Sequence, residues 1–354
     1  MATSRVIGLD IGSSGVRAAE LEFGSGGPSG KNPPTLLRFG QVPLPPGAVR
    51  DGEVAQPATV STALRQLWSQ AKFVSKDVII GVGNQRVIVR DVDLPWMPLA
   101  QIRETLPFQV NDLLPMSTDD ALLDFYAIEE VTGPQGRMLR GMLVAAQRDT
   151  VSANVMAVEG AGLTPRMVDL NGFALARALT RGEFARSTVA LVDIGASITT
   201  VVVAAQGIPR LVRSLPVGGH NVTAAIASAL RIAPADAETI KREIGIGYAV
   251  PPERQDAAEA TTTVLRSLVE SIRNTFVYYS GNHPGGGIDV VVLTGGGSHL
   301  PGLGQYLSSA SRLPVTLGDP LAGLRTGKFA GSEALHGAES LIALPIGLAF
   351  GVAA

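Results

Sequence analysis

Two short stretches of the chain combine an acidic residue with a small-residue turn, a pattern suited to binding phosphate and a metal ion. In residues 6–21, Asp10 ends an apolar run and is followed by Gly12, Ser13 and Ser14. Glycines allow backbone conformations in which successive N–H groups converge on an anion. Because a carboxylate beside such a nest repels phosphate, the pattern favours phosphate bound together with Mg²⁺, which Asp10 would reach through water. The alternative is a plain β-hairpin with a Gly/Ser turn.

The second stretch, residues 189–203, repeats the Asp-Ile-Gly-x-Ser core of the first. Asp193 stands in the position of Asp10 and is followed by Gly195 and Ser197. In each half of the chain a strand pattern and then a helix pattern come after this core. A repeat of this length predicts two related lobes, each with one hairpin. Two facing hairpins with one Asp each can hold a phosphate chain and its metal from both sides.

Other residues could complete such a site. A glycine triplet follows an apolar strand pattern and precedes Ser298, so a flat ligand could lie against its backbone. Arg17 lies on the strand after the first turn and could reach back to a phosphate; the alternative is a surface arginine. Glu238 and Lys241 lie one turn apart on a predicted helix, which by itself indicates only a surface ion pair.

Composition narrows the classes of function. The chain has 354 residues, enough for two sizeable cores, and its 29 Lys+Arg against 31 Asp+Glu predict no general nucleic-acid-binding surface. It has no cysteine, which excludes disulfides, thiolate catalysis and Cys-ligated metals. We found no signal-peptide pattern and no apolar run long enough to span a bilayer. We therefore expect a soluble cytoplasmic protein.

The elements expected around these residues follow from hydrophobic periodicity. Strand patterns cover residues 35–42, 77–83, 167–171, 209–215 and 288–293, and helix patterns cover residues 58–71, 173–179, 221–230, 235–244 and 261–279.

Residues 84–164 have no counterpart in the second half and predict an added subdomain. It would contain a strand at 87–94, a helix after Pro98, a hairpin turning at 133–136 and a closing helix at 150–159. Five residues here share a bulky apolar or proline side chain: Trp96, Met97, Pro107, Phe108 and Leu113. We expect most of them in a core; the alternative is an exposed partner surface.

Residues 10–17, 193–200 and 295–298, in this order, resemble the two phosphate loops and the adenosine loop of the actin/Hsp70/hexokinase-like ATPase fold. The added unit resembles the subdomain that distinguishes the FtsA and PilM families. The finer match is to the PilM family of type IV pilus proteins, and it covers nearly the whole chain. It is carried by residues 8–14, Leu106-Pro-Phe-Gln, residues 173–178 and residues 346–349.

The resemblance implies an α/β, RNase H-like two-lobed fold with duplicated βββαβα cores and an FtsA/PilM-type insert. The implied units are a first lobe (1–83, 165–185 and 325–354), the insert (84–164), a second lobe (186–230 and 268–324) and a helical subdomain (231–267).

The resemblance also assigns residues to ATP and Mg²⁺. Asp10 and Asp193 would hold the metal, mostly through water. The nucleotide-binding set would be Asp10, Gly12, Ser13, Ser14, Arg17, Asp193, Gly195, Ser197, Thr199, Glu238, Lys241, Gly295, Gly296, Gly297 and Ser298. Arg17 stands where lysine is usual, which changes reach and geometry. Asn171, or Asp169 beside it, falls where related ATPases orient the attacking water. Because an asparagine is a poor proton acceptor, we expect slow or undetectable hydrolysis.

The function implied by the resemblance is an ATP-binding cytoplasmic scaffold of type IV pilus assembly, peripheral at the inner face of the cytoplasmic membrane. Its partner would be the N-terminal cytoplasmic peptide of a PilN-like inner-membrane protein, with membrane contact only through that partner and self-association left open. One alternative is an FtsA-like, membrane-tethered filament former; the charge-free segment at 346–354 disfavours its basic amphipathic helix. A small-molecule kinase of the same fold is less favoured, because no acidic motif for a catalytic base is evident.

Overall fold

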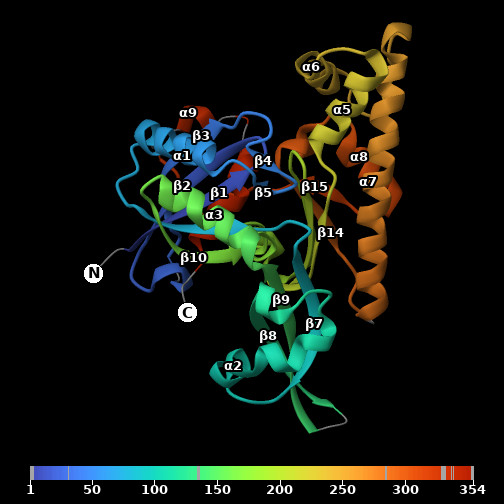
Figure 1. The fold of residues 1–354 in the computed structure, drawn as a ribbon. Helices are drawn as coiled ribbons and strands as arrows, with labels where there is room; N and C mark the ends of the chain where they lie inside the picture. Colours follow the sequence, from blue (N-terminus) through green and yellow to red (C-terminus); the bar gives the residue numbers. More distant parts are fainter. Residues whose placement is uncertain are drawn as a thin grey trace.

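The computed structural model describes residues 4–30, 32–133, 136–283, 285–327, 332–335, 337 and 339–351. Two five-stranded sheets lie side by side, and a smaller three-stranded unit extends from them (Figure 1). We call the sheet that contains β1, with the helices packed on it, the first lobe. The sheet that contains β11, with its helices, is the second lobe.

The first sheet has the strand order β10-β6-β1-β2-β3. Its strands are β1 (Ser4–Gly12), β2 (Gly15–Phe23), β3 (Thr35–Pro43), β6 (Asp77–Val82) and β10 (Thr164–Leu170). β1 and β2 form an antiparallel hairpin in which Asp10 lies opposite Arg17, whereas β6 runs parallel to both β1 and β10. The predicted hairpin over residues 6–21 is therefore confirmed.

The second sheet repeats this plan in the order β13-β12-β11-β14-β15. Its strands are β11 (Thr188–Ile194), β12 (Thr199–Ala205), β13 (Ile208–Leu215), β14 (Val290–Thr294) and β15 (Val315–Leu317). β11 and β12 are antiparallel, and β14 runs parallel to β11 with Thr294 beside Asp193. The internal repeat read from the two Asp-Ile-Gly-x-Ser cores is thus a repeat of structure.

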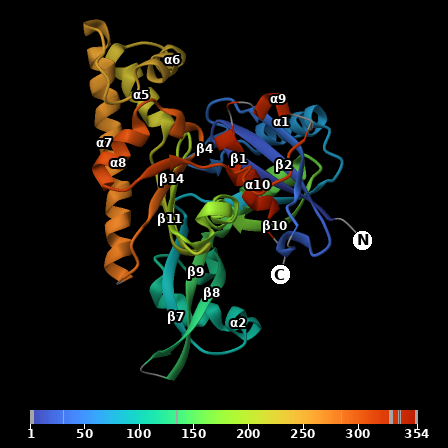
Figure 2. The same ribbon diagram turned by 180° about the vertical axis from the view of Figure 1, so that it is seen from behind.

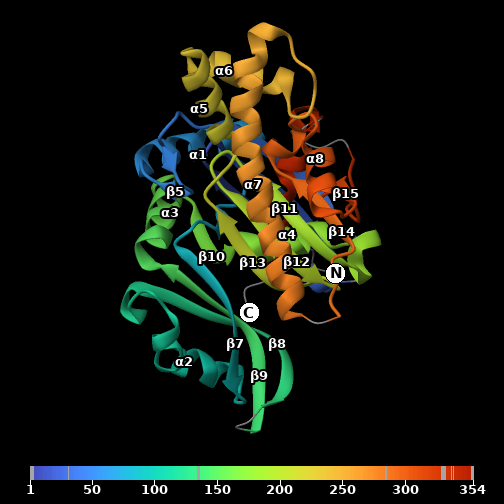
Figure 3. The same cartoon turned by 90° about the vertical axis from the view of Figure 1, so that its right-hand side faces the viewer.

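Helices cover the outer faces of both sheets. The first lobe carries α1 (Pro57–Ala71) and α3 (Arg148–Gly160), and the second carries α5 (Gly219–Leu230), α6 (Pro234–Ile244), α7 (Gln255–Asn282) and α8 (Leu303–Ser311). Figure 3 shows α7 running along the whole second lobe. It begins six residues before the predicted helix, because the buried face continues to Ala257 and Thr261. Among the described residues no helix is both long and apolar enough to cross a membrane.

A thin apolar layer joins the two sheets. It contains α4 (Asn171–Leu179) and α10 (Ala343–Ala349), and it is packed with side chains of both sheets, such as Leu21 and Leu191. The short helix α9 (Ser332–Leu335) lies near β3. Figure 2 shows α10 lying across β1 and β2. Every residue of α10 is buried.

Glycines bring the backbones of this layer into contact. A Cβ at Gly8 of β1 would overlap the carbonyl oxygen of Pro345, and a Cβ at Gly347 would overlap that of Ala174. These two positions therefore set how closely α10 approaches β1 and α4.

The insert itself consists of β7 (Val87–Pro95), α2 (Leu99–Val110), β8 (Ala121–Gly133) and β9 (Gly136–Gln147), with the strand order β7-β9-β8. The helix expected at 150–159 to close the insert is α3, which instead packs on α1 in the core of the first lobe, so from here on the insert means residues 87–147. Ile102, Leu106 and Val110 of α2 pack on the sheet. The hairpin predicted at 133–136 connects β8 to β9, although residues 134–135 themselves lie outside the described residues. A further small hairpin, β4 (Val49–Arg50) and β5 (Glu53–Val54), belongs to the first lobe.

The close approach of α10 predicts a large effect of Gly347→Ala. The added methyl group has to push α10 away from α4, so we expect the free energy of unfolding to fall by at least ~2 kcal/mol. The measurement is urea unfolding followed by circular dichroism. The control is Gly281→Ala on α7, where a Cβ would meet nothing within 4 Å. That change should be neutral or stabilising by up to ~1 kcal/mol. Equal stability of the two variants would show that the contact of α10 with α4 at Gly347 is not tight.

Candidate functional site

The two predicted aspartates lie at the junction of the lobes, each at the carboxyl end of a central strand. Both are largely shielded from water, and the charge of Asp10 adds to the free-energy cost of ionising Asp193. Burial, and then the charge of Asp10, raises the pKa of Asp193 to about 7, and the nearby Arg17 lowers it in part. Burial likewise raises the pKa of Asp10, against the opposing effect of Arg17. A cation between the two carboxylates would relieve this strain.

Arg17 folds back over the first turn, as expected from its place on β2. Its guanidinium donates to Asp10 Oδ2 and to Ser14 Oγ, each over 3.3 Å. Its Nε is buried and has no hydrogen-bond partner. The side chain therefore offers a positive charge and an unused donor at the first turn. An arginine here can bind a phosphate oxygen as the expected lysine would, but in a fixed planar geometry.

The glycine triplet forms a third loop directly against the second phosphate loop. Gly295 has φ +79°, and a Cβ there would overlap Asp193 Oδ1, while a Cβ at Gly297 would overlap the side chain of Ile194. Ser298 is buried, and its hydroxyl donates to the Gly295 carbonyl over 2.6 Å. The triplet therefore lies directly against Asp193, and Ser298 holds the loop shape.

The second phosphate loop has two differently used hydroxyl groups. Thr199 is fully buried and donates to the Val217 carbonyl over 2.7 Å, so its hydroxyl is occupied within the lobe. Ser197 Oγ lies 3.4 Å from Nδ1 of His220. Gly195 closes the loop by donating its N–H to the Ile198 carbonyl over 2.9 Å.

Glu238 and Lys241 form the ion pair expected on α6, but Lys241 is buried and also links α6 to α5, whereas the Glu238 side chain keeps 29% exposure. The Lys241 ammonium donates to the Gly219 carbonyl over 3.2 Å, to Thr223 Oγ1 over 3.0 Å and to Glu238 Oε2 over 2.6 Å. All three of its protons are thus used. Burial raises the pKa of Glu238, but hydrogen bonds from Lys241 and Thr223 outweigh it and hold the pKa below its usual value.

His220, which the sequence reasoning did not consider, lies beside the second turn, with its Nδ1 3.4 Å from Ser197 Oγ. It is half-buried at the start of α5, and burial, together with the charge of Lys241, lowers its pKa. The available signal was the Gly218-Gly219 pair directly before a predicted helix, because glycines there let the helix start approach the second turn. The Gly219 and His220 N–H groups donate to the Gly195 and Ala196 carbonyls over 3.0 and 2.7 Å.

Of the two candidate water-orienting residues, Asp169 is already engaged. It forms an ion pair with Arg177, and that arginine also donates to the Gly347 carbonyl over 3.1 Å. Asn171 packs its amide across Gly81 and Gly83, and its Oδ1 is buried without a partner. Because Gly81 of β6 is one residue beyond Ile80, the partner of Leu9 on β1, Asn171 lies at the same sheet edge as Asp10.

The residues present fit a metal held mainly by water and phosphate. Within the described part of the chain, no three His, Cys, Asp or Glu side chains are placed to hold a metal ion together. Asp10 and Asp193 supply only two carboxylates, which suits Mg²⁺, an ion that keeps several waters and binds substrate phosphates. The unpartnered Arg17 Nε and Asn171 Oδ1 are the kind of buried groups that a ligand would satisfy.

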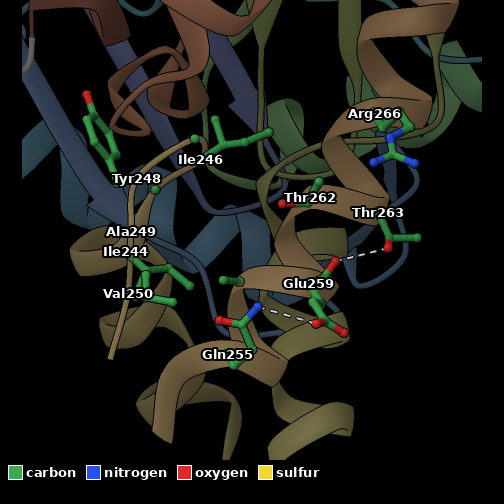
Figure 4. Close-up of a pocket in the computed structure, with 13 residues that line it drawn as sticks. Ile244, Ile246, Tyr248, Ala249, Val250, Gln255, Glu259, Thr262, Thr263 and Arg266 are labelled. Carbon is green, nitrogen blue, oxygen red and sulfur yellow. Dashed lines mark hydrogen bonds between the residues drawn. The ribbon is translucent and has the colours of Figure 1, made fainter. Parts of the chain in front are cut away.

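A separate cavity of about 560 Å³ lies between α7 and residues 245–250 (Figure 4). Its lining includes Gln255, Glu259 and Arg266 of α7 on one side and Ile246 and Tyr248 on the other (Figure 4). Its lining includes none of the residues that the sequence assigns to nucleotide or metal.

The insert presents a second candidate site on and around α2, where four apolar side chains are exposed; we call these four residues together the α2 surface. They are Trp96 and Leu99 near the start of α2, Phe108 on its outward side and Leu113 just after its end, and Phe108 is 86% exposed. The expectation that most of the insert's bulky apolar residues are in a core is therefore wrong for Trp96, Phe108 and Leu113. Ile102, Leu106 and Val110 take the inward face of α2, which turns Phe108 to the outside. Trp96 is fixed by Arg137, 4.1 Å above its ring, and by a hydrogen bond to Glu130.

The sequence and the fold of this chain are similar to those of known proteins. The family model for "Type IV pilus assembly protein PilM" matches residues 8–352. The solved "PilM-PilN type IV pilus biogenesis complex" is similar with a TM-score of 0.81 and 27% identity, covering 97% of each chain. MreB 5 of Spiroplasma citri, solved with AMPPNP, has a TM-score of 0.53 at 15% identity over 98% of this chain and 95% of that one. FtsA of Bacillus subtilis is 22% identical over 89% of this chain and 78% of its own length. The expected actin-like fold is thereby confirmed.

The raised pKa of Asp193 predicts a pH dependence of stability. Its pKa rises from 3.8 to about 7 on folding, so the folded state keeps a proton that the unfolded chain releases. The free energy of unfolding should therefore fall as pH rises between these values and change little above about pH 7. Urea unfolding measured across this range is the test. Asp193→Asn should flatten this slope, whereas Asp256→Asn on the exposed start of α7 should keep it. If the free energy of unfolding of Asp193→Asn falls with pH as steeply as that of the parent, another group causes the pH dependence.

Proposed function

Because the chain belongs to the type IV pilus assembly protein PilM family, we propose that it is an actin-like scaffold that binds ATP with Mg²⁺ and a PilN-like partner. The observation that carries the nucleotide part is the burial of Asp10 and Asp193 opposite each other, one from each lobe. Like charges in such a place favour a bound cation, and the two glycine-containing turns favour phosphates.

In this proposal each part of the site has a distinct task. Asp10 and Asp193 hold the metal through water, while Arg17 and the backbone of both turns bind phosphate oxygens. The loop of Gly295–Gly297 gives the adenosine a surface without side chains. Glu238 meets the ribose, and Lys241 keeps α6 in place against α5. The bound Mg²⁺ neutralises the phosphate charge.

We further propose that hydrolysis is slow. Attack of water on a phosphate needs a group that positions the nucleophile. Asn171 can accept a hydrogen bond through its unpartnered Oδ1, but it cannot take up a proton. Asp169 is held by Arg177. The nucleotide would then serve mainly to fix the arrangement of the lobes.

The nucleotide proposal predicts Mg²⁺-dependent stabilisation by ATP. At 100 times its dissociation constant, ATP should raise the free energy of unfolding by about 2.7 kcal/mol. Asp10→Ala and Asp193→Ala should each weaken Mg-ATP binding by at least ~10-fold, about 1.4 kcal/mol. Isothermal titration of nucleotide-free protein measures this directly.

The matched control is Asp256→Ala, which removes the same charge from an exposed helix end and should leave binding unchanged. Parent-like affinity in both site variants would refute the two-sided metal clamp. No heat and no stabilisation with any adenine nucleotide would refute nucleotide binding itself.

The partner part of the proposal rests on family membership and on the α2 surface. A similar structure is a PilM-PilN complex, and we propose that this chain likewise binds the N-terminal cytoplasmic peptide of a PilN-like inner-membrane protein. A phenylalanine that is 86% exposed on a helix, in a subdomain that also exposes a tryptophan, is unusual outside an interface. Through this partner the protein would be held at the inner face of the cytoplasmic membrane.

Removing the aromatic side chain from the α2 surface should weaken peptide binding. For Phe108→Ser we expect a loss of at least ~10-fold, since exposed aromatic anchors contribute most to such interfaces. Fluorescence anisotropy with a labelled synthetic peptide is the measurement. Val74→Ser, at a first-lobe position that is 80% exposed, is the matched control. If both variants bind the peptide like the parent, the partner lies elsewhere on the molecule.

A further inference from the structure

The β4–β5 hairpin lies between the second phosphate loop and the root of the insert. In Figure 1 it sits between the two large sheets. Its tip residue Gly52 has φ +76°, and a Cβ there would lie 3.3 Å from Ile198 Cγ1 and 3.0 Å from Asn84 Cβ. The tip therefore belongs to the first lobe in sequence but contacts a loop of the second lobe.

The residue that follows the tip, Glu53, ties this hairpin to the insert through its carboxylate. Glu53 Oε1 accepts from Arg86 Nε over 3.0 Å, from Thr150 Oγ1 over 3.2 Å and from Asn84 Nδ2 over 3.3 Å. Asn84 also donates to the Gly52 carbonyl over 3.4 Å. Asn84 and Thr150 are almost fully buried.

These contacts bind both chain segments that join the insert to the first lobe. Asn84 and Arg86 lie where the chain enters the insert, and Thr150 lies just after it leaves. The two segments also contact each other, because the Gln147 N–H donates to the Arg86 carbonyl over 3.1 Å. A displacement of Glu53 would therefore act on both attachments of the insert together.

We propose that the β4–β5 hairpin transmits nucleotide occupancy at the second phosphate loop to the insert. This rests on the proposed nucleotide binding and adds to it a route of regulation. Any nucleotide-linked shift of the second loop relative to the first lobe has to move Ile198 against Gly52. The hairpin then either follows and carries Glu53 with it, or loses a contact that stabilises one arrangement. Either response gives the insert a different free energy in the two states, which is what coupling between sites requires.

The test is amide hydrogen exchange of the full chain with and without Mg-ATP, read separately in three regions. These are the phosphate turns, the hairpin at 49–54, and the insert root at 84–90 and 147–151. The main test variant is Glu53→Ala. A second variant, Thr150→Val, removes the hydrogen bond from Thr150 to Glu53 with little change in side-chain volume. The matched control is Glu22→Ala, because the Arg5–Glu22 pair has the same side-chain exposures as Arg86–Glu53, 53% and 27%. Each protein is compared with its own nucleotide-free form.

In the parent and in Glu22→Ala, we expect Mg-ATP to slow exchange at all three regions, by at least ~5-fold at the insert root. In Glu53→Ala the phosphate turns should still be protected while the change at the insert root is lost, and Thr150→Val should reduce it. The proposal is overturned if Mg-ATP slows exchange at the insert root equally in Glu53→Ala and in the parent. It is also overturned if Mg-ATP protects the phosphate turns of the parent but leaves exchange at its insert root unchanged. Absence of protection at the turns themselves would refute nucleotide binding, and the relay with it.

Discussion

The structure depends above all on the placement of two like charges, Asp10 and Asp193, in a poorly hydrated junction. Such a pair is unfavourable by itself, and the pKa of about 7 for Asp193 expresses that cost. Arg17 offsets part of that cost, because it bends back onto Asp10 and its charge lowers the pKa of both carboxyl groups. Gly295 lets the third loop approach Asp193 without a side chain between them, which adds to its burial. The same arginine that could bind a phosphate therefore also makes the junction tolerable in the absence of a ligand.

The two aspartates meet because an apolar layer holds the sheets together. α4 and α10 pack between the sheets, and glycines on β1 and α10 allow backbone contact there. Packing of this layer places the carboxyl ends of β1 and β11, which carry the two turns, next to each other. A ligand at these edges would contact both lobes, and its affinity would depend on their spacing.

The hairpins and most elements were predictable, because each depends on residues close in sequence: an apolar run, a small-residue turn and a second run. The contacts of Lys241 and Glu53 could not be predicted, because their hydrogen-bond partners lie up to 22 and 97 residues away in the sequence. Helical spacing of Ile102, Leu106 and Val110 already assigned Phe108 to the opposite face of α2. The expectation of a core role for Phe108 relied on residue type where periodicity was the better guide.

The insert is connected by chain to the first lobe, yet it also rests on the second. Arg210 of β13 lies 3.4 Å from Glu129 of β8, and Val212 packs into the cluster at the root of the insert. A cavity of about 410 Å³ separates β7 from β13 nearby, so this contact is incompletely packed. Loosely packed seams slide at lower cost than filled cores. The hairpin contact at Gly52 is close, whereas the cavity between β7 and β13 leaves room for the insert to shift against the second lobe.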